Sequence, residues 1–398
     1  MLCKTVLDVP KRNLQMKNFI RGIGQFFAEA DILILALSLI SAIYGVILIS
    51  STVISPTMRS PNAIPVQIGA IVIGLVLFVI FTYVDIDIIA DKSILLFAFS
   101  VLFILTLVVW GEGEIVGRRA WLRFWGIGIQ PSEIVKVTFI IIIAKMMMNF
   151  KERKTLDSFL SIAQLGAVFV IMFMLVWRVS EDIGTALVYL AVFVIMLFLG
   201  GVRMRWFVIA GVIVGLIAPI FFAYVLEQHQ RDRIMAPFVS AYVIDPTGQY
   251  VTWQVRQSLA AISGGGVFGQ GLGSGAVTQA GWVPVQHTDF IFSVAAEELG
   301  FVGAMGVILL LVAIIVRCIY VGAKSNNPIG MLVCTGVAAM FITQTIMNLG
   351  MVLGIMPVIG VTLPFFSYGG SSIVTCFAAL GLVSGIKMRP KQARFRSL

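Results

Sequence analysis

Charged side chains are scarce in this sequence, and their scarcity indicates the class of protein. Only 12% of the 398 residues are charged, whereas 59% are hydrophobic. A soluble domain carries about 25% charged residues. Apolar stretches near the ~20 residues that cross a bilayer recur along the chain, and the alternating pattern of an outer-membrane barrel is missing. The composition predicts an all-α integral membrane protein with many spans.

Cysteine and histidine are also rare, which excludes several kinds of site. The four cysteines form no CxxC pair, so neither a disulfide framework nor a zinc site is expected. Two histidines, His229 and His287, are too few for a dedicated metal centre. The net charge of +9 follows membrane topology in its distribution rather than nucleic-acid binding. We therefore expect membrane lipids as neighbours and no nucleic-acid partner.

The apolar stretches predict ten membrane-spanning helices. Their expected ranges are 32–53, 66–84, 94–110, 132–149, 159–177, 184–200, 206–226, 290–316, 329–353 and 368–386. Lys and Arg are more than twice as frequent in the segments on the side of the two termini as in those on the other side. By the positive-inside rule, both termini are expected in the cytoplasm.

One membrane domain, residues 31–388, is expected between two cytoplasmic tails. The basic segment 1–30 shows no cleavable signal with a small-residue exit site. Its residues Phe19, Ile23 and Phe26 share a helical face, which suits a helix lying among lipid headgroups. A disordered tail is an equal alternative. Residues 389–398 are expected to form the second, short tail.

Two outer loops, 111–131 and 227–289, hold most of the arginines that this topology places outside. A loop as long as the second is usually functional or disordered. Its aromatic residues and its glycine-rich run 263–275 predict an ordered cap in which the run packs close to substrate or bilayer. A loop that merely turns tightly through positive φ angles is the alternative. The run is neither a Rossmann fingerprint nor a P-loop, because it lacks both the βαβ context and Gly-Lys-Ser/Thr.

Asp289 lies where the long outer loop becomes an apolar helix. An aspartate there can simply cap free backbone N–H groups. An ionisable group at the membrane boundary is equally a candidate functional group, and the residues alone leave the two interpretations even. A carboxylate near arginines suits attack by an alcohol with a phosphate leaving group. The carboxylate takes the proton, and guanidinium groups hold the phosphate.

Acidic residues also stand at the start of two other spans. Glu133 and Lys136 share a helix face and can form an ion pair. Pairing is strongly favoured in a bilayer, where an unpaired charge costs about 2.5–3.5 kcal/mol. A purely structural pair is the alternative to a functional one. Asp182, which precedes the sixth span, can cap its helix or belong to the site.

Two further polar pairs lie within the later spans. Glu297 is about 80° around a helix from Asp289 and Glu298 about opposite, so at most one shares a face with Asp289. The other is expected to bind a neighbouring helix. Gln344 and Asn348 form a polar stripe, for which hydrogen bonding between helices is the simpler interpretation.

Together these motifs resemble the SEDS family (shape, elongation, division and sporulation), the RodA/FtsW type of cell-wall polymerase. The matching segments are Gln130-Pro131-Ser132-Glu133 with Lys136, Asp182–Leu187, Gln257-Ser258 with Ser263-Gly264-Gly265, His287–Phe292, Glu297–Gly300, and Leu363-Pro364 with Ser367–Ser372. They extend from about residue 110 to the end, in family order. Asn348–Val352 and the short C-terminal tail are more similar to the elongation (RodA) branch than to the division branch.

The resemblance implies a peptidoglycan glycosyltransferase of the bacterial cytoplasmic membrane, with a large extracytoplasmic loop between helices seven and eight. It implies polymerisation of lipid II onto an undecaprenyl-linked glycan, with undecaprenyl pyrophosphate leaving. Asp289 corresponds to the family's essential aspartate and would act as general base. The implied supporting residues are Trp121, Glu133, Lys136, Asp182, Arg231, Arg233, His287 and Glu297. The implied partner is a class B penicillin-binding protein, and a divalent cation (Mg or Mn) is an optional assistant to pyrophosphate departure.

Two departures from the family pattern concern the loops around the site. The arginine that usually precedes the tryptophan is moved back in Gly117-Arg118-Arg119-Ala120-Trp121, and Ser180-Glu181 replaces Gln-Pro. Two other functions stay open: a flippase for lipid-linked precursors, and a scaffold for a transpeptidase. A flippase needs a polar path to the cytoplasmic face, whereas Glu133, Asp182 and Asp289 are all expected at outer helix ends. That placement favours the enzyme.

Overall fold

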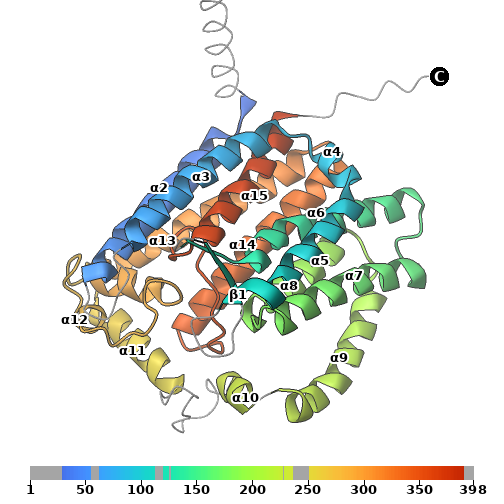
Figure 1. The fold of residues 1–398 in the computed structure, drawn as a ribbon. Coiled ribbons are helices and arrows are strands. Elements are labelled where there is room, and N and C mark those ends of the chain that lie inside the picture. The colour runs from blue at the N-terminus through green and yellow to red at the C-terminus, as the bar shows by residue number, and fades with distance from the viewer. Residues whose placement is uncertain are drawn as a thin grey trace, which may run out of the picture.

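Long apolar helices packed side by side make up most of the molecule (Figure 1). The computed structural model describes residues 29–54, 62–112, 120–124, 127–226, 228–235 and 251–389. Its long helices are α2 (Ile32–Ile54), α3 (Ala63–Tyr83), α5 (Ser93–Trp110), α6 (Pro131–Glu152), α7 (Phe159–Arg178), α8 (Ile183–Leu199), α9 (Met204–Tyr224), α13 (Ile291–Lys324), α14 (Pro328–Val352) and α15 (Gly370–Met388). Each predicted span overlaps one of them.

Eight of the helices in the described residues are long and apolar enough to cross a membrane. The other two long helices are not in this set. Helix α8 is too short, with 17 residues, and α6 is too charged, because it carries Glu133, Lys136 and Lys145. The predicted class, an all-α protein with many spans, is confirmed, and the count of ten spans stays a prediction. Helix α13 continues beyond residue 316, the predicted end of the eighth span, to Lys324.

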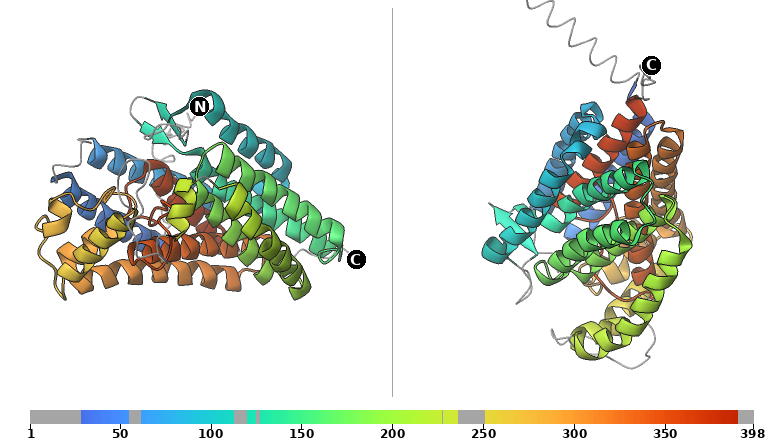
Figure 2. Two further views of the ribbon diagram at one scale, coloured as in Figure 1. Left: turned by 90° about the horizontal axis from the view of Figure 1, so that it is seen from below. Right: turned by 90° about the vertical axis from the view of Figure 1, so that its right-hand side faces the viewer.

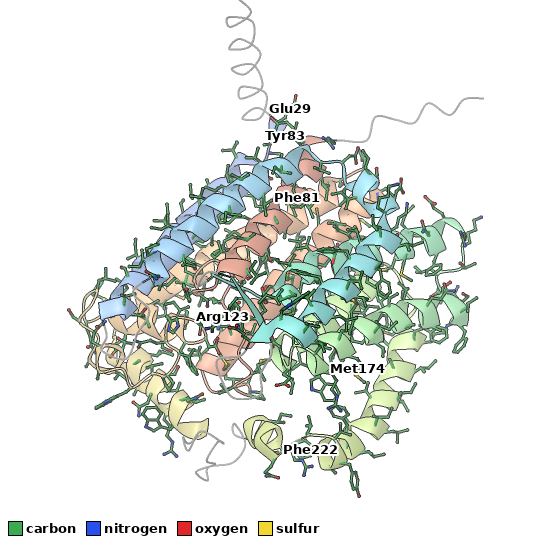
Figure 3. The ribbon with its side chains drawn as sticks, viewed as in Figure 1. Glu29, Phe81, Tyr83, Arg123, Met174 and Phe222 are labelled. Carbon is green, nitrogen blue, oxygen red and sulfur yellow. The ribbon has the colours of Figure 1, made fainter. Side chains whose placement is uncertain are left out.

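The two ends of the helix bundle carry different segments. Glu29 and Tyr83 lie at the end from which both termini emerge, and Phe222 lies at the opposite end (Figure 3). We call these the tail end and the loop end. Predictions for residues 1–28 and 390–398, for Arg118 and Arg119, and for 236–250 concern positions outside the described residues.

Helices α14 and α15 form the centre of the bundle, and most of their residues are buried. Glycine permits the close packing of α15 on α3. A Cβ atom added at Gly381 would lie 2.6 Å from the Phe78 carbonyl oxygen, and one at Gly385 would lie 2.8 Å from that of Thr82. Such backbone approach is how membrane helices gain van der Waals contact without a hydrophobic driving force.

Helix α9 differs from the others because none of its residues is buried. It stands away from α7 and α8 as it descends toward the loop end (Figures 1 and 2). Aromatic pairs hold it: Phe159–Trp206, Phe198–Phe207 and Trp177–Phe221, with ring centroids 6.2, 5.8 and 5.0 Å apart. In a bilayer its exposed surface would contact lipid.

The tail end is held by ionic and polar contacts. Asp31 is fully buried and its Oδ2 accepts from the Nε of Arg317 at 2.8 Å. Short helix α4 (Ile86–Asp91) contributes two further carboxylates. Asp91 pairs with Lys145 of α6 at 2.6 Å, and Asp87 accepts from the Asn327 amide at 3.0 Å. These contacts join the start of α2 to α13, and α4 both to α6 and to the turn before α14.

The loop end contains secondary structure that the sequence did not reveal. Three short strands, β1 (Gly111–Glu112), β2 (Trp121–Phe124) and β3 (Ile127–Ile129), form an antiparallel sheet in the order β1-β2-β3. Three helices follow α9: α10 (Gln228–Met235), α11 (Val251–Gly264) and α12 (Ala276–Gln279). The described part of loop 227–289 thus contains helices, although its sequence carries little secondary-structure signal.

The glycine-rich run inserts into a break in α13 at Gly300, whose φ is 70° and ψ −165°. An unbroken helix would bond the N–H groups of residues 301 and 302 to the carbonyls of 297 and 298. Instead, Phe301 and Val302 donate to Gly266 and Val267, while Gln270 and Gly271 donate to Glu297 and Glu298, at 2.9–3.2 Å. Four bonds to the run replace two helical bonds. The positive φ angles of the alternative, a tightly turning loop, are present at four of its glycines, Gly266, Gly269, Gly271 and Gly273.

Candidate active site

Asp289 lies in a turn between α12 and α13. Three consecutive backbone carbonyls of this turn accept hydrogen bonds from residues later in the chain. The Tyr368 N–H donates to the His287 carbonyl at 2.8 Å. The Ser367 hydroxyl donates to Thr288, and the Asn348 amide donates to Asp289 at 2.8 Å. All three donors come from α14 or the segment between α14 and α15. The turn is therefore fixed by parts of the chain that follow it by 59 residues or more.

The Asp289 side chain is half-buried and lies against Gly360. A Cβ atom added at Gly360 would be 3.3 Å from Oδ2 of Asp289. The N-cap position of α13 belongs to Phe290, which makes no side-chain capping bond. Asp289 thus stands one residue outside the position that the capping interpretation requires.

Asp182 occupies the other side of the same segment. As N-cap of α8 it accepts from the Thr185 N–H at 2.9 Å and hydroxyl at 2.6 Å, and from the Gln130 amide at 2.8 Å. A Cβ atom added at Gly184 would lie 2.4 Å from the Ile359 carbonyl oxygen and 3.3 Å from that of Gly360. The start of α8 and the Asp289 carboxylate therefore both contact segment 359–360. The capping interpretation of Asp182 is confirmed.

Burial and hydrogen bonds act in opposite directions on Asp182. Removal from water raises the pKa of its carboxyl group, and the bonds from Thr185 oppose that rise. The nearby Glu133 charge raises the pKa further, whereas Lys136 lowers it. The Gln130 amide, at the N-cap of α6, links Asp182 to the helix that carries the ion pair.

The predicted ion pair is present, and it is buried. Lys136 Nζ and Glu133 Oε1 are 2.8 Å apart, and both residues are at most 5% exposed. Next to the pair, the Tyr189 hydroxyl donates to the Ser132 carbonyl at 2.9 Å, which joins α8 to α6. The first turns of α6 and α8 and the Asp289 turn thus form one cluster at the loop end.

Removing Lys136 should destabilise the protein more than removing the whole pair. Lys136→Met leaves a buried Glu133 carboxylate without its ion-pair partner, and breaking a buried pair costs about 3–5 kcal/mol. The double variant Glu133→Gln/Lys136→Met leaves no charge behind and should recover most of that loss. Thermal unfolding of the purified proteins in detergent measures the difference. Equal losses in the single and double variants would contradict this account.

Trp121 lies on the small sheet beside this cluster. Its ring covers Gly128 on the paired strand, where an added Cβ atom would be 3.0 Å away. The Ser371 hydroxyl accepts from the Gln130 N–H at 2.8 Å and donates to the Gly128 carbonyl at 3.3 Å. The sheet is thereby attached to the first turn of α15.

Only one of the two predicted arginine side chains, that of Arg231, lies in the described part of the structure. Arg231 donates to the carbonyls of Leu226 and Ala223, at 3.0 and 2.7 Å, and so closes the C-terminal end of α9. The side chain of Arg233 lies outside the described part of the structure. His287 packs its ring against Tyr368, with centroids 5.7 Å apart.

Glu297 and Glu298 are both fully buried and both bind the segment around α12. The Glu297 carboxylate accepts from the N–H groups of Val277 and Thr278, at 2.7 and 2.9 Å. Glu298 accepts from the Ser51 hydroxyl and from the Gln279 amide at 2.8 Å. The expected helix partner is confirmed for Glu298, since Ser51 belongs to α2. Glu297 supports the loop before Asp289.

The model of the FtsW/RodA/SpoVE cell cycle protein family matches residues 31–392 of this chain. The chain belongs to this family. It is the family that the sequence motifs resemble, and the match includes every segment of the site described above. The probable peptidoglycan glycosyltransferase FtsW of Trichlorobacter lovleyi is 34% identical over 302 residues, which cover 74% of this chain and 76% of that protein.

Other members of the family are similarly related. The peptidoglycan glycosyltransferase MrdB of Escherichia coli K12 is 30% identical over 327 residues, covering 82% of this chain and 85% of that protein. A chain in a solved peptidoglycan synthase complex, which coordinates polymerisation and crosslinking, superposes with a TM-score of 0.76 at 27% identity. That match covers 91% of this chain and 99% of the other. As a family member with many apolar helices, the chain is a multi-pass protein of the bacterial cytoplasmic membrane.

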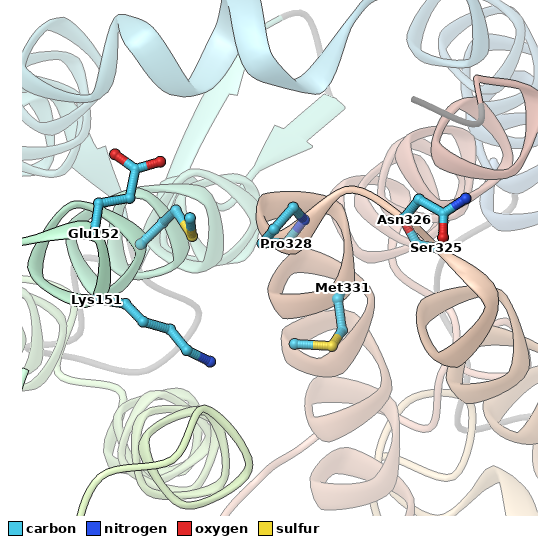
Figure 4. A pocket seen from close by; sticks show the side chains of 7 residues that line it. Lys151, Glu152, Ser325, Asn326, Pro328 and Met331 are labelled. Atoms are coloured by element: carbon cyan, nitrogen blue, oxygen red, sulfur yellow. The ribbon is translucent and has the colours of Figure 1, made fainter. Parts of the chain in front are cut away.

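Two further features of this family member concern metal binding and a pocket outside the site. The described residues contain no group of three His, Cys, Asp or Glu side chains placed to hold a metal ion. Mg²⁺ is usually held by one or two carboxylates together with substrate phosphates, and a cation that assists pyrophosphate departure stays a prediction. A pocket of about 340 Å³ lies at the tail end, between the end of α6 and the start of α14 (Figure 4). Its lining residues are Met148, Lys151, Glu152, Ser325, Asn326, Pro328 and Met331, none of which belongs to the site.

Sequence reasoning missed three contributors to the site. Gly360 and Ser367 act through a segment without regular structure, where single residues give no periodic signal. Asn348 was expected to bond another helix, but it donates to two loop carbonyls. Its location deep in an apolar helix was the available signal, because a buried amide needs partners.

Proposed function

We propose that this glycosyltransferase joins lipid II units into glycan strands at the outer surface of the bacterial cytoplasmic membrane. The observation that carries the proposal is the position of Asp289, which is half-buried, held at its backbone and adjacent to the Asp182 cluster. These groups share one end of the bundle, opposite the termini. With both termini in the cytoplasm, that end faces outward, where a polymerase would meet flipped precursor.

In the proposed reaction Asp289 is the general base. It takes the proton of the 4-hydroxyl of the lipid II N-acetylglucosamine, and that oxygen attacks the anomeric carbon of the strand's terminal N-acetylmuramic acid. A new carbon–oxygen bond forms as the bond to undecaprenyl pyrophosphate breaks, and the pyrophosphate leaves with the bonding electron pair. General-base help of this kind is worth about 10²–10⁴ in rate.

The surrounding residues would divide into positioning and binding roles. Asp182 and the Glu133–Lys136 pair would fix the starts of α8 and α6 beside the Asp289 turn. Trp121 and His287 offer rings near this cluster for a sugar face. Arginines of the outer loops would hold pyrophosphate bidentately, with Arg231 and Arg233 the nearest in sequence to the end of α9. Glu297 would support the loop.

A reconstituted assay separates this proposal from lipid transport. The purified protein in liposomes is given fluorescent lipid II, and the products are resolved by size. Polymerised glycan without any other glycosyltransferase is the expected result. The same liposomes are tested for lipid II crossing the bilayer by quenching of label in the outer leaflet. Transport without polymer would overturn the proposal and support the flippase.

The elongation branch and a transpeptidase partner are also proposed. Asn348–Val352 and the short C-terminal tail support the RodA assignment. The similar chain of known structure comes from a peptidoglycan synthase complex in which polymerisation and crosslinking are coordinated, and this supports the partner. Depletion should then make rod-shaped cells round, whereas a division polymerase would leave filaments. Co-expression with a class B penicillin-binding protein from the same genome should yield a complex that polymerises faster than the protein alone.

A further inference from the structure

The amide of Asn348 joins the Asp289 turn to the segment on which the Asp289 carboxylate rests. Its Nδ2 donates to the Asp289 carbonyl at 2.8 Å and to the Val361 carbonyl at 2.7 Å. Val361 follows Gly360, the residue that Oδ2 of Asp289 lies against. One side chain thus sets the distance between the backbone of Asp289 and the surface that supports its carboxylate.

This arrangement is costly for Asn348, which suggests that it has a purpose beyond packing. The side chain is fully buried, and its Oδ1 has no hydrogen-bond partner in the described structure. A buried acceptor without a partner costs about 1–3 kcal/mol. Both hydrogens of the amide are committed to carbonyl oxygens, so the group has none left to donate to substrate.

We propose that Asn348 is a positioning residue for the reaction, which holds the Asp289 carboxylate in its productive place by clamping two carbonyls. The proposal rests on Asp289 acting as general base. Catalysis by a positioned base is sensitive to geometry, and a displacement of about 1 Å can cost about 10²-fold in rate. Loss of the clamp should therefore lower kcat for polymerisation and leave KM for lipid II nearly unchanged.

Three variants test the clamp in the reconstituted enzyme. Asn348→Leu has nearly the same shape and no donor. Asn348→Asp is isosteric and has no donor when ionised, so it serves if the leucine variant does not fold. Gln344→Met is the matched control, because Gln344 lies one turn away on α14, is 1% exposed and also has an unpartnered oxygen. We expect kcat to fall about 10–100-fold in the two Asn348 variants and to stay within about twofold in the control.

A double-mutant cycle with Asp289→Asn separates positioning from general structural damage. If the clamp places the base, the base is already ineffective in Asn348→Leu, and Asp289→Asn should cost far less there than in the wild type. A residue that only stabilises the fold would give multiplicative losses instead, and that result would overturn the inference.

The same cycle distinguishes failure of the inference from failure of the proposed function. Full activity of Asp289→Asn alone would remove the proposed function. A large loss in Asp289→Asn together with normal kcat in both Asn348 variants would leave the function in place and refute the clamp. A tenfold or greater rise in KM with unchanged kcat would also refute it, because the amide would then serve binding.

Discussion

Replacing Asp289 with Asn should lower the rate of glycan polymerisation about 10²–10⁴-fold while the protein stays folded. The substitution keeps the shape of the side chain and the carbonyl that Asn348 holds at 2.8 Å. It removes only the ability to take a proton from the attacking hydroxyl. The measurement is the initial rate of lipid II consumption by the purified, reconstituted variant, compared with wild type at equal protein concentration.

The matched control is Glu181→Gln, which removes another acidic group at the same end of the bundle. Glu181 is exposed and lies next to Asp182, yet the N-cap of α8 is Asp182 and not Glu181. Its loss lowers the local negative charge without touching the cluster, so the rate should stay within about twofold. An Asp289→Asn enzyme as fast as this control would mean that proton removal at this position does not limit the reaction.

Local sequence patterns predicted the features that depend on residues close to one another in the chain. Apolar runs located the long helices because a bilayer demands about 20 apolar residues per span. The i,i+3 spacing of Glu133 and Lys136 predicted their ion pair, which is present at 2.8 Å. Helix geometry predicted that one of Glu297 and Glu298 would bind a neighbouring helix, and Glu298 accepts from Ser51 of α2.

The rest of the site depends on contacts between distant segments, which local patterns do not contain. Asn348 meets Asp289 across 59 positions, and the Ser371 hydroxyl meets Gln130 across 241. The strands of the small sheet are two to four residues long, too short for the alternation that reveals a strand. The length of α13 was underestimated because Arg317 and Lys324 suggested a loop, whereas Arg317 instead pairs with the buried Asp31.

Replacing Gly300 with Ala should unfold the junction on which the Asp289 turn depends. The backbone at Gly300 has φ 70° and ψ −165°, a region that is essentially restricted to glycine. An added Cβ atom would lie 2.3 Å from the Gly269 nitrogen and 2.5 Å from the Val267 oxygen, and both are backbone atoms. The strain costs about 1–3 kcal/mol, and each hydrogen bond lost from the inserted run costs about 1 kcal/mol more.

The first nine residues of α13 begin directly after the Asp289 turn and end at this break, so the damage should reach activity as well as stability. We expect the melting temperature to fall by roughly 5–10 °C and polymerisation to be nearly lost. Gly306→Ala is the control on the same helix, since its nearest neighbour is the Tyr44 ring at an ordinary 3.7 Å. That variant should match or exceed wild-type stability, because alanine favours helix more than glycine by about 1 kcal/mol. Equal melting temperatures and equal polymerisation rates for the two variants would contradict this account. They would show that the break in α13 accepts alanine without cost and that the inserted glycine run does not hold Asp289 in place.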